Sequence, residues 1–330
     1  MKPVFIGGCP RSGTTFLASL LASHPNCVAV PESQFIVDTY RSLGKETGKL
    51  EAEKVLSRIE RNWRYQVGWG DIAEELPKQR RSSRLPYPEI IKYLIEGFIE
   101  GRGNKKKSEI NYWVDHTPSN IRRLEVLFKL FPDARAIHIV RDGRGCANSV
   151  IPLDWGPNTV KHASNWWLKN LSFGLAAENR WSHSKVFRVS YEDLLLEAED
   201  TLKDITSWLE IDFKERMTEA EEIAVPRYTR NQHELIGSSG ESDRATAWQQ
   251  ELRARQVEVF EYFAGPMLSY LGYPLNSSGE PEPPSTYEDL IFELKQVLKS
   301  RVVNRARKNY RKFRSLNSKK SRTPPAGRGI

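Results

Sequence analysis

The chain has 330 residues, of which 39% are hydrophobic and 10% aromatic, enough for one large α/β domain with a sizeable core. No apolar run approaches the roughly 18 residues that cross a bilayer. Lys2 leads directly into a short strand and a glycine loop, which leaves no room for a signal peptide. The three cysteines have no metal-like spacing and imply no disulfide framework. We therefore expect a soluble cytoplasmic protein.

The net charge of +8 is concentrated at one end of the sequence. From Lys295 onward there are 13 Lys or Arg residues and no acidic residue, so residues 1–294 carry a formal charge of about −5. We therefore expect no nucleic-acid-binding core. The basic tail is predicted either to contact anionic lipid, an acidic partner or a second subunit, or to form a solvated, partly helical extension.

Short strands alternate with helices along the chain, which predicts a parallel sheet covered on both faces. The fold class expected is a P-loop-like three-layer α/β domain with a central parallel sheet of four or five strands, a helical insert and a C-terminal helical extension. The predicted strands are residues 4–6, 27–30, 112–114, 134–140 and 186–190. The predicted helices between them include residues 15–23, 119–131, 143–150 and 160–181.

Two regions stand apart from this alternation. Residues 38–110 form the predicted helical insert, with amphipathic stretches near 49–61 and 88–101. The main domain is expected to span residues 1–275. Residues 276–330 are expected to form a Pro-rich linker, a basic amphipathic helix and a disordered end. Ser285 and Glu288 have the spacing of a capping box at the start of that helix, and its apolar residues repeat every four positions up to Tyr310.

A glycine loop follows the first predicted strand and has the spacing G-x-x-x-x-G-x-T of a phosphate-binding loop. Such a loop turns backbone N–H groups and a helix N-terminus toward one oxyanion. Thr14 occupies the position where a nucleotide triphosphatase carries Lys, and Arg11 lies inside the loop instead. Because a kinase needs that lysine and a metal ion to spread the charge of its phosphates, transfer from ATP is not expected. The loop residues are Pro10, Arg11, Ser12, Gly13, Thr14 and Thr15.

A second motif follows the predicted strand at 134–140. Arg141 lies at the end of this strand and Ser149 eight residues later on the next helix. A guanidinium at a strand tip and a hydroxyl two turns along a helix suit one phosphate, because Arg supplies forked donors. Two phosphate motifs about 130 residues apart fit a nucleotide with phosphates at both its 5′ and 3′ positions.

The Pro10–Thr15 string and the Ile139–Ser149 segment resemble the 5′-phosphosulfate and 3′-phosphate motifs of the PAPS-dependent sulfotransferase superfamily, especially its bacterial and tyrosylprotein/Golgi-type branches. The resemblance covers roughly residues 3–273. It implies transfer of a sulfuryl group from PAPS to a hydroxyl acceptor without a metal, with PAP released. The acceptor is a carbohydrate, a tyrosyl side chain, a lipid or a small metabolite, and the insert at 38–110 is where its specificity is expected.

The same resemblance assigns roles to single residues. Arg11 is expected to stabilise the bridging oxygen of the leaving phosphate. Tyr191, in a "YEDL" segment, is either a residue near the adenine or part of an ordinary strand-to-helix cap. Arg244 resembles a segment that closes over the 3′-phosphate, although the glycine-rich pattern of the cytosolic enzymes is absent.

Two residues are candidates for the general base that takes the acceptor proton. Glu32 follows a short strand and matches the base glutamate of the tyrosylprotein-type branch, and burial would raise its pKa toward working pH. His116 stands in Asp115-His116-Thr117-Pro118, where the family often has Lys, and is predicted to act as base, as a protonated stabiliser of the sulfuryl group, or as a structural histidine.

Two other functions remain open from the sequence. A P-loop phosphotransferase or kinase would require magnesium and ATP, and the missing lysine argues against it. A non-catalytic nucleotide-binding module would lack candidates for the base, whereas Glu32 and His116 are both present.

Overall fold

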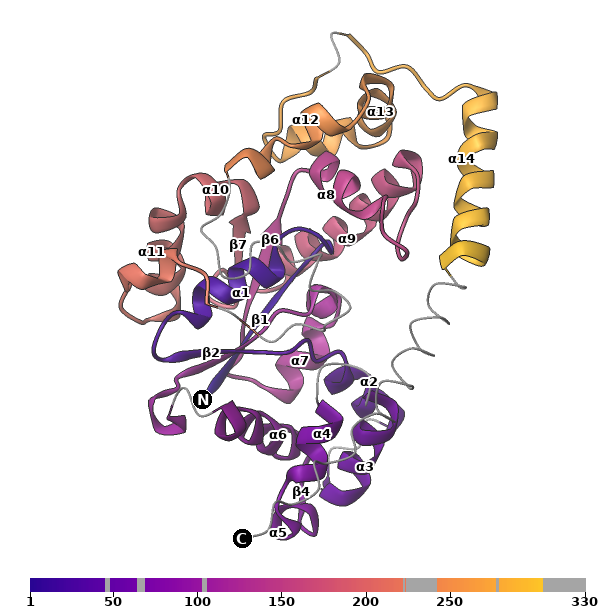
Figure 1. The fold of residues 1–330 in the computed structure, drawn as a ribbon. Coiled ribbons are helices and arrows are strands. Elements are labelled where there is room, and N and C mark those ends of the chain that lie inside the picture. Colours follow the sequence, from indigo (N-terminus) through magenta and orange to yellow (C-terminus); the bar gives the residue numbers. More distant parts are fainter. Residues whose placement is uncertain are drawn as a thin grey trace, which may run out of the picture. The chain divides into compact units, whose positions relative to one another are not determined.

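The computed structural model in Figure 1 divides into two compact units, which are described separately. The first unit comprises Met1–Arg141 and Lys169–Thr246, and the second comprises Asp142–Leu168 and Ala247–Ile330. The structure describes residues 1–44, 48–63, 69–102, 106–221, 223, 242–276 and 279–304. No helix in these ranges is long and apolar enough to cross a membrane.

A five-stranded parallel sheet lies at the centre of the first unit, in the order β2-β5-β1-β6-β7. Its strands are β1 (Lys2–Gly8), β2 (Cys27–Val30), β5 (Tyr112–Asp115), β6 (Arg135–Val140) and β7 (Val186–Ser190). The predicted parallel sheet is thus confirmed. β1 extends beyond the predicted residues 4–6 because it pairs with a neighbour on each side, Lys2 with Tyr112 of β5 and Gly8 with Ile139 of β6.

Helices cover both faces of this sheet, as the alternation along β1 shows. Phe5 lies in one hydrophobic cluster, whereas Val4 and Ile6 lie in the other. The cluster of Val4 and Ile6 includes residues of α1 (Thr14–Ala22), α10 (Tyr191–Leu196) and α11 (Ala198–Leu209). The cluster of Phe5 includes residues of α2 (Phe35–Ser42), α3 (Ala52–Trp63), α4 (Trp69–Glu75), α6 (Tyr87–Arg102) and α7 (Leu124–Leu130).

The insert is mainly helical, as predicted, and it shares the core of the sheet. Its amphipathic stretches form α3 and α6, whose buried residues join the cluster that contains Phe5. The structure adds the short helix α5 (Lys78–Arg81) and an antiparallel ribbon of β3 (Lys49–Glu51) and β4 (Arg84–Pro86). Strands of three residues are too short to produce a readable alternation, so the sequence did not predict them. Residues 45–47, 64–68 and 103–105 of the insert lie outside the described ranges.

The predicted single helix at 119–131 is wrong in its first half. Pro118–Arg122 forms a 3₁₀ turn, and α7 begins only at Leu124. This turn packs directly on β1, because a Cβ added at Gly7 would come within 2.5 Å of the Ile121 nitrogen. The close approach of two backbones therefore requires glycine at position 7.

The second unit is built around a buried charged side chain. Arg144, on α8 (Gly143–Val150), donates hydrogen bonds to Asp142 and Glu261 and lies 3.9 Å from the centroid of the Trp248 ring. Glu261 belongs to α13 (Ala254–Tyr270) and Trp248 to α12 (Trp248–Glu251). A buried guanidinium with two carboxylate partners and an aromatic face satisfies the requirement that buried charges be paired.

The predicted C-terminal helix is present as α14 (Thr286–Leu298), and Ser285 and Glu288 form the expected capping box. A π-helical turn follows at Lys299–Val303. The predicted continuation to Tyr310 and the predicted disordered end lie outside the described residues. The predicted division of the chain at residue 275 stays a prediction.

A buried histidine in the first unit fixes one side of α9 (Val160–Arg180) against the sheet. His138 of β6 lies 2.5 Å from the Glu178 carboxylate, and Arg188 also donates to Glu178. Burial raises the pKa of Glu178, but these two hydrogen bonds outweigh it and hold the pKa at about 2. A Cβ added at Gly174 would lie 2.0 Å from the His138 ring.

We expect Gly174→Ala to lower the free energy of unfolding by about 1–3 kcal/mol, because overpacking forces this ring from its place. Gly101→Ala is the matched control, since a Cβ on that helical glycine meets no atom within 4 Å. The control should leave stability unchanged or raise it by up to about 1 kcal/mol. Urea denaturation of both variants measures the difference, and equal stabilities would contradict the packing described.

Candidate active site

The predicted site residues of the first unit follow the carboxyl ends of its five strands. These ends meet at one edge of a parallel sheet, where ligands bind in open α/β folds. The strand ends are followed by Glu32 (β2), His116 (β5), the loop Pro10–Thr15 (β1), Arg141 (β6) and Tyr191 (β7). The sheet order therefore collects segments from across the first 191 residues at one edge.

The glycine loop between β1 and α1 has the backbone of an anion-binding turn. Arg11 and Gly13 both have left-handed conformations, with φ of 74° and 92°. The Ser12 N–H closes the turn on the Cys9 carbonyl at 3.1 Å, and α1 begins at Thr14. Alternating left- and right-handed residues before a helix form a concavity lined by N–H groups.

The Arg141 guanidinium joins this loop to two other segments. It donates to the Arg11 carbonyl at 2.9 Å and to the Arg244 carbonyl at 3.2 Å, and it lies 4.3 Å from the centroid of the Tyr191 ring. That ring is itself packed against the loop, because a Cβ at Gly13 would come within 2.4 Å of it. The structure thus brings the loop, Arg141, Tyr191 and Arg244 together.

Ser149 belongs to a different unit from these residues. It is half-buried on α8, one position before the end of that helix. The N-cap of α8 is Asp142, whose side chain accepts a hydrogen bond from the Arg144 N–H. The role predicted for Ser149 stays a prediction from the sequence.

A buried carboxylate links the loops that carry the two base candidates. Asp115, the last residue of β5, accepts hydrogen bonds from the Ser33 hydroxyl and from the Thr117 backbone N–H and hydroxyl, the last two at 2.9 and 2.6 Å. The Thr117 hydroxyl also accepts a bond from the Ser33 N–H at 2.8 Å. Ser33 follows Glu32 and Thr117 follows His116, so this network fixes both candidates relative to each other.

Glu32 is half-buried and held at both ends. Its carboxylate accepts a hydrogen bond from the Gln34 amide at 2.6 Å, and its carbonyl accepts one from the Trp69 indole at 3.1 Å. Burial raises the pKa of Glu32 to about 7, the Gln34 hydrogen bond opposes that rise, and the nearby Asp115 adds to it. A carboxylate with this pKa is suited to take a proton near neutral pH.

His116 is buried and contacts the glycine loop. Its Nδ1 lies 3.4 Å from the Thr15 hydroxyl, and its Nε2 has no hydrogen-bond partner among the described residues. Burial lowers the pKa of His116 to about 4, so the ring is neutral at physiological pH. When the Thr15 hydroxyl donates to Nδ1, the ring proton lies on Nε2, which can then donate to a bound group.

Three residues around the base candidates were not identified from the sequence: Asp115, Gln34 and Trp69. Asp115 is recognisable only as a carboxylate at a strand end next to His116. Gln34 stands two positions after Glu32 but carries no local signal. Trp69 lies 37 positions after Glu32, so its contact depends on how the insert folds. Its ring packs between Phe35 and Phe98, with centroids 5.2 and 5.8 Å away.

Fold and loop together define a class: an α/β protein with a parallel sheet and, after its first strand, a glycine turn with the backbone of an anion-binding loop. The chain belongs to the sulfotransferase family, whose family model matches residues 3–215. Protein-tyrosine sulfotransferase A of Caenorhabditis elegans is 24% identical over 285 residues, 83% of this chain and 68% of that protein. Protein-tyrosine sulfotransferase 1 of Danio rerio is 24% identical over 311 residues, 86% of this chain and 76% of that protein.

Solved structures show the same fold. The sulfotransferase domain of the Synechococcus PCC 7002 olefin synthase superposes with a TM-score of 0.60 at 21% identity, over 83% of this chain and 96% of that one. The sulfotransferase domain of the curacin biosynthetic pathway gives a TM-score of 0.58 at 16% identity, over 83% and 98% of the two chains. The expected fold and family are thereby confirmed.

The raised pKa of Glu32 predicts a pH-dependent effect of Glu32→Gln on stability. Because the pKa is about 7 in the folded protein and 4.5 without these contacts, ionisation of Glu32 opposes folding. The gain from Glu32→Gln should be absent below pH 4.5, grow between pH 4.5 and 7, and stay constant above, reaching about 1–3 kcal/mol. Chemical denaturation across this range measures it.

Glu89→Gln, at an exposed position of α6, controls for the loss of a carboxylate elsewhere. A difference between Glu32→Gln and wild type that does not change with pH would show that the carboxylate is not destabilised by burial.

Proposed function

We propose that this protein transfers a sulfuryl group from PAPS to the hydroxyl of an acceptor and releases PAP. The observation that carries the proposal is the contact of Arg141 with the Arg11 carbonyl. This hydrogen bond connects a loop suited to bind one phosphate with a guanidinium suited to bind a second phosphate. Arg11 and Arg141 are 130 positions apart in the sequence. A donor with a 5′-phosphosulfate and a 3′-phosphate matches two adjacent anion sites, whereas ATP carries its phosphates in a single chain.

The loop would hold the 5′-phosphosulfate. Backbone N–H groups from Ser12 to Thr15 and the N-terminus of α1 supply donors, and Arg11 supplies a charge for the bridging oxygen. Thr14 replaces the lysine of a nucleotide triphosphatase. The two left-handed residues fit an oxyanion with further acceptor oxygens, as does the His116 Nε2, for which the described part of the chain offers no hydrogen-bond partner.

The 3′-phosphate is assigned to Arg141, with Arg244 and Ser149 as further candidates from the sequence. Arg141 donates to the Arg11 and Arg244 carbonyls through different guanidinium nitrogens, Nη1 and Nη2. Tyr191 lies beneath this guanidinium and against Gly13, so its contribution is to support the loop. A contact of Tyr191 with the adenine remains part of the proposal from family resemblance.

Glu32 is the proposed general base, because its pKa of about 7 lies closer to neutrality than the value of about 4 for His116. The acceptor oxygen forms a bond to sulfur while the bond from sulfur to the 5′-phosphate oxygen breaks. The acceptor proton passes to Glu32, and the negative charge of the departing phosphate falls on the loop donors. His116 is neutral, so we assign it a hydrogen bond from Nε2 to the transferring group rather than the role of a protonated stabiliser.

The acceptor is proposed to be a hydroxyl compound that enters beside Glu32. Trp69 of the insert contacts the backbone of Glu32, which supports a role for the insert in shaping acceptor access. Two relatives are named protein-tyrosine sulfotransferases, so a tyrosine-containing peptide is the first acceptor to test. The cytoplasmic location expected from the sequence belongs to this proposal, and the three cysteines, all buried thiols, are compatible with it.

Calorimetric titration with PAP tests the donor site. We expect binding that does not depend on magnesium and that Arg141→Ala weakens by about 1.5–3 kcal/mol, the value of a charged hydrogen bond. Arg141→Lys should be intermediate, since lysine retains the charge but not the fork. Arg216→Ala, at an exposed position of the 3₁₀ turn Glu215–Thr218, should bind like wild type. Failure to bind PAP, with magnesium-dependent binding of ATP, would sink the proposal and favour a kinase.

Rates of PAP release from PAPS, with a tyrosine-containing peptide as acceptor, distinguish the two base candidates. With Glu32 as base, kcat/KM should rise with pH and level off above about pH 7. Glu32→Gln should lower kcat by about 10²–10⁴-fold and abolish this rise. His116→Asn should lower the rate but keep the rise. If His116→Asn instead abolished it, the base would be His116.

A further inference from the structure

The C-terminal helix of the second unit presents its apolar side outward. Leu290, Leu294, Leu298 and Val302 are 56%, 60%, 60% and 57% exposed, although helices of globular proteins normally bury such a stripe. Tyr287 and Val297 are exposed beside them. At 100° per residue these six side chains occupy one face of the helix. We call this face the outer stripe.

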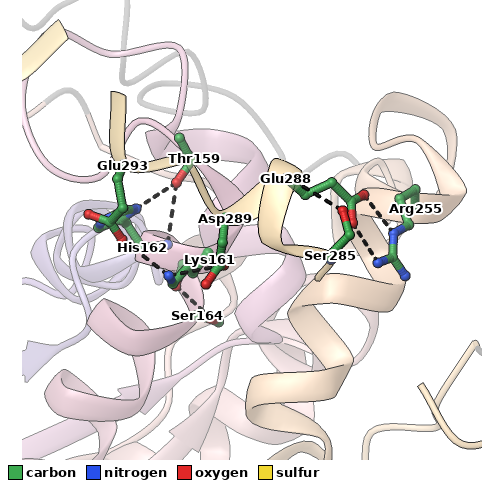
Figure 2. Close-up of polar contacts among 9 residues, drawn as sticks. All are labelled: Thr159, Lys161, His162, Ser164, Arg255, Ser285, Glu288, Asp289 and Glu293. Carbon is green, nitrogen blue, oxygen red and sulfur yellow. Dashed lines mark hydrogen bonds and ion pairs between the residues drawn. The ribbon is translucent and has the colours of Figure 1, made fainter. Parts of the chain in front are cut away.

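The opposite face of α14 is the one that binds the rest of the unit, and it does so through charge (Figure 2). Lys161 of α9 pairs with Asp289 at 3.0 Å and with Glu293 at 3.1 Å. Arg255 of α13 forms two hydrogen bonds, both of 2.9 Å, to the Glu288 carboxylate. The inward face thus carries three ion-paired carboxylates as well as the half-buried Phe292.

The acidic residues of this helix all lie on its inward face. Glu288, Asp289 and Glu293 are the only acidic residues between Thr286 and Asn304, and each is paired with a cation of the unit. Lys295, Lys299 and Arg301, in contrast, are exposed. The sequence after Asn304 adds ten Lys or Arg and no acid. An apolar stripe bordered by cations is the composition of a helix that lies in the plane of an anionic bilayer.

We propose that α14 docks the protein on an anionic lipid surface, with the outer stripe in the headgroup boundary and the basic residues on the headgroups. The helix is continuous over the 17 residues from Thr286 to Val302, or about 25 Å, and presents a convex stripe. A bilayer offers an apolar layer and negative charge along that whole length. A second copy of the chain would instead bring two sets of 13 cations toward each other, and these repel.

Co-sedimentation of the full chain with lipid vesicles tests this proposal. The probes are vesicles of phosphatidylcholine with about 30% phosphatidylglycerol and vesicles of phosphatidylcholine alone. We expect the partition coefficient to be at least about tenfold higher for the anionic vesicles and to fall at high salt. Leu294→Glu should reduce it by about tenfold or more, because it places a carboxylate within the outer stripe.

Leu196→Glu is the matched control, since Leu196 is also a helical leucine, is 63% exposed and lies outside α14. It should bind vesicles like wild type. Circular dichroism and PAP binding monitor folding of both variants, and Leu298→Glu repeats the test if Leu294→Glu is unstable.

Three outcomes would overturn the proposal. The first is no preference for anionic vesicles. The second is binding that persists unchanged in Leu294→Glu, which would assign it to the basic sequence alone. The third is a concentration-dependent dimer in light scattering that Leu294→Glu dissociates, without vesicle binding, which would make a second copy the occupant. Because the nucleotide site is tested separately with PAP, failure here leaves the proposed activity standing.

Discussion

The candidate site in the first unit depends on hydrogen-bond donors that satisfy the backbone carbonyl groups of its glycine loop. Two residues of that loop have left-handed conformations, so its peptide oxygens cannot all be used in a regular element. The Arg141 guanidinium donates one hydrogen bond to the Arg11 carbonyl and another to the Arg244 carbonyl. One side chain therefore fixes the loop, a remote segment and the ring of Tyr191 together. Any anion that binds Arg141 also meets a loop already held in place.

Burial and neighbouring groups act in opposite directions on the pKa of Glu32, which lies beside this loop. Burial disfavours the charge of Glu32, Gln34 favours it, and the carboxylate of Asp115 disfavours it again. Asp115 contributes in a second way, because its hydrogen bonds fix the segments that follow both Glu32 and His116. A single buried acid thus influences both the position and the proton affinity of its neighbours.

Much of the fold could be predicted from the sequence, because periodic apolar runs and glycine turns are local signals. Strand β7 and helix α8 begin and end where predicted. The three-residue strands β3 and β4 and the 3₁₀ turn before α7 could not be predicted, because they depend on packing against distant backbone. For the candidate site, Arg11 could be proposed from the loop motif and Glu32 from the family resemblance, and their roles stay predictions. Trp69 was not, because its partner lies 37 residues away.

The inward-facing acidic residues of α14 couple the attachment of this helix to its unit with the proposed binding of an anionic surface. Between Thr286 and Asn304 the chain carries three acidic and three basic residues, so the isolated helix is formally neutral. It becomes effectively cationic only while Lys161 and Arg255 neutralise its carboxylates. Attachment of the helix to its unit therefore creates the charge that attracts an anionic surface. Because coupling between two binding equilibria is reciprocal, an anionic surface that binds α14 must also strengthen the attachment of α14 to its unit.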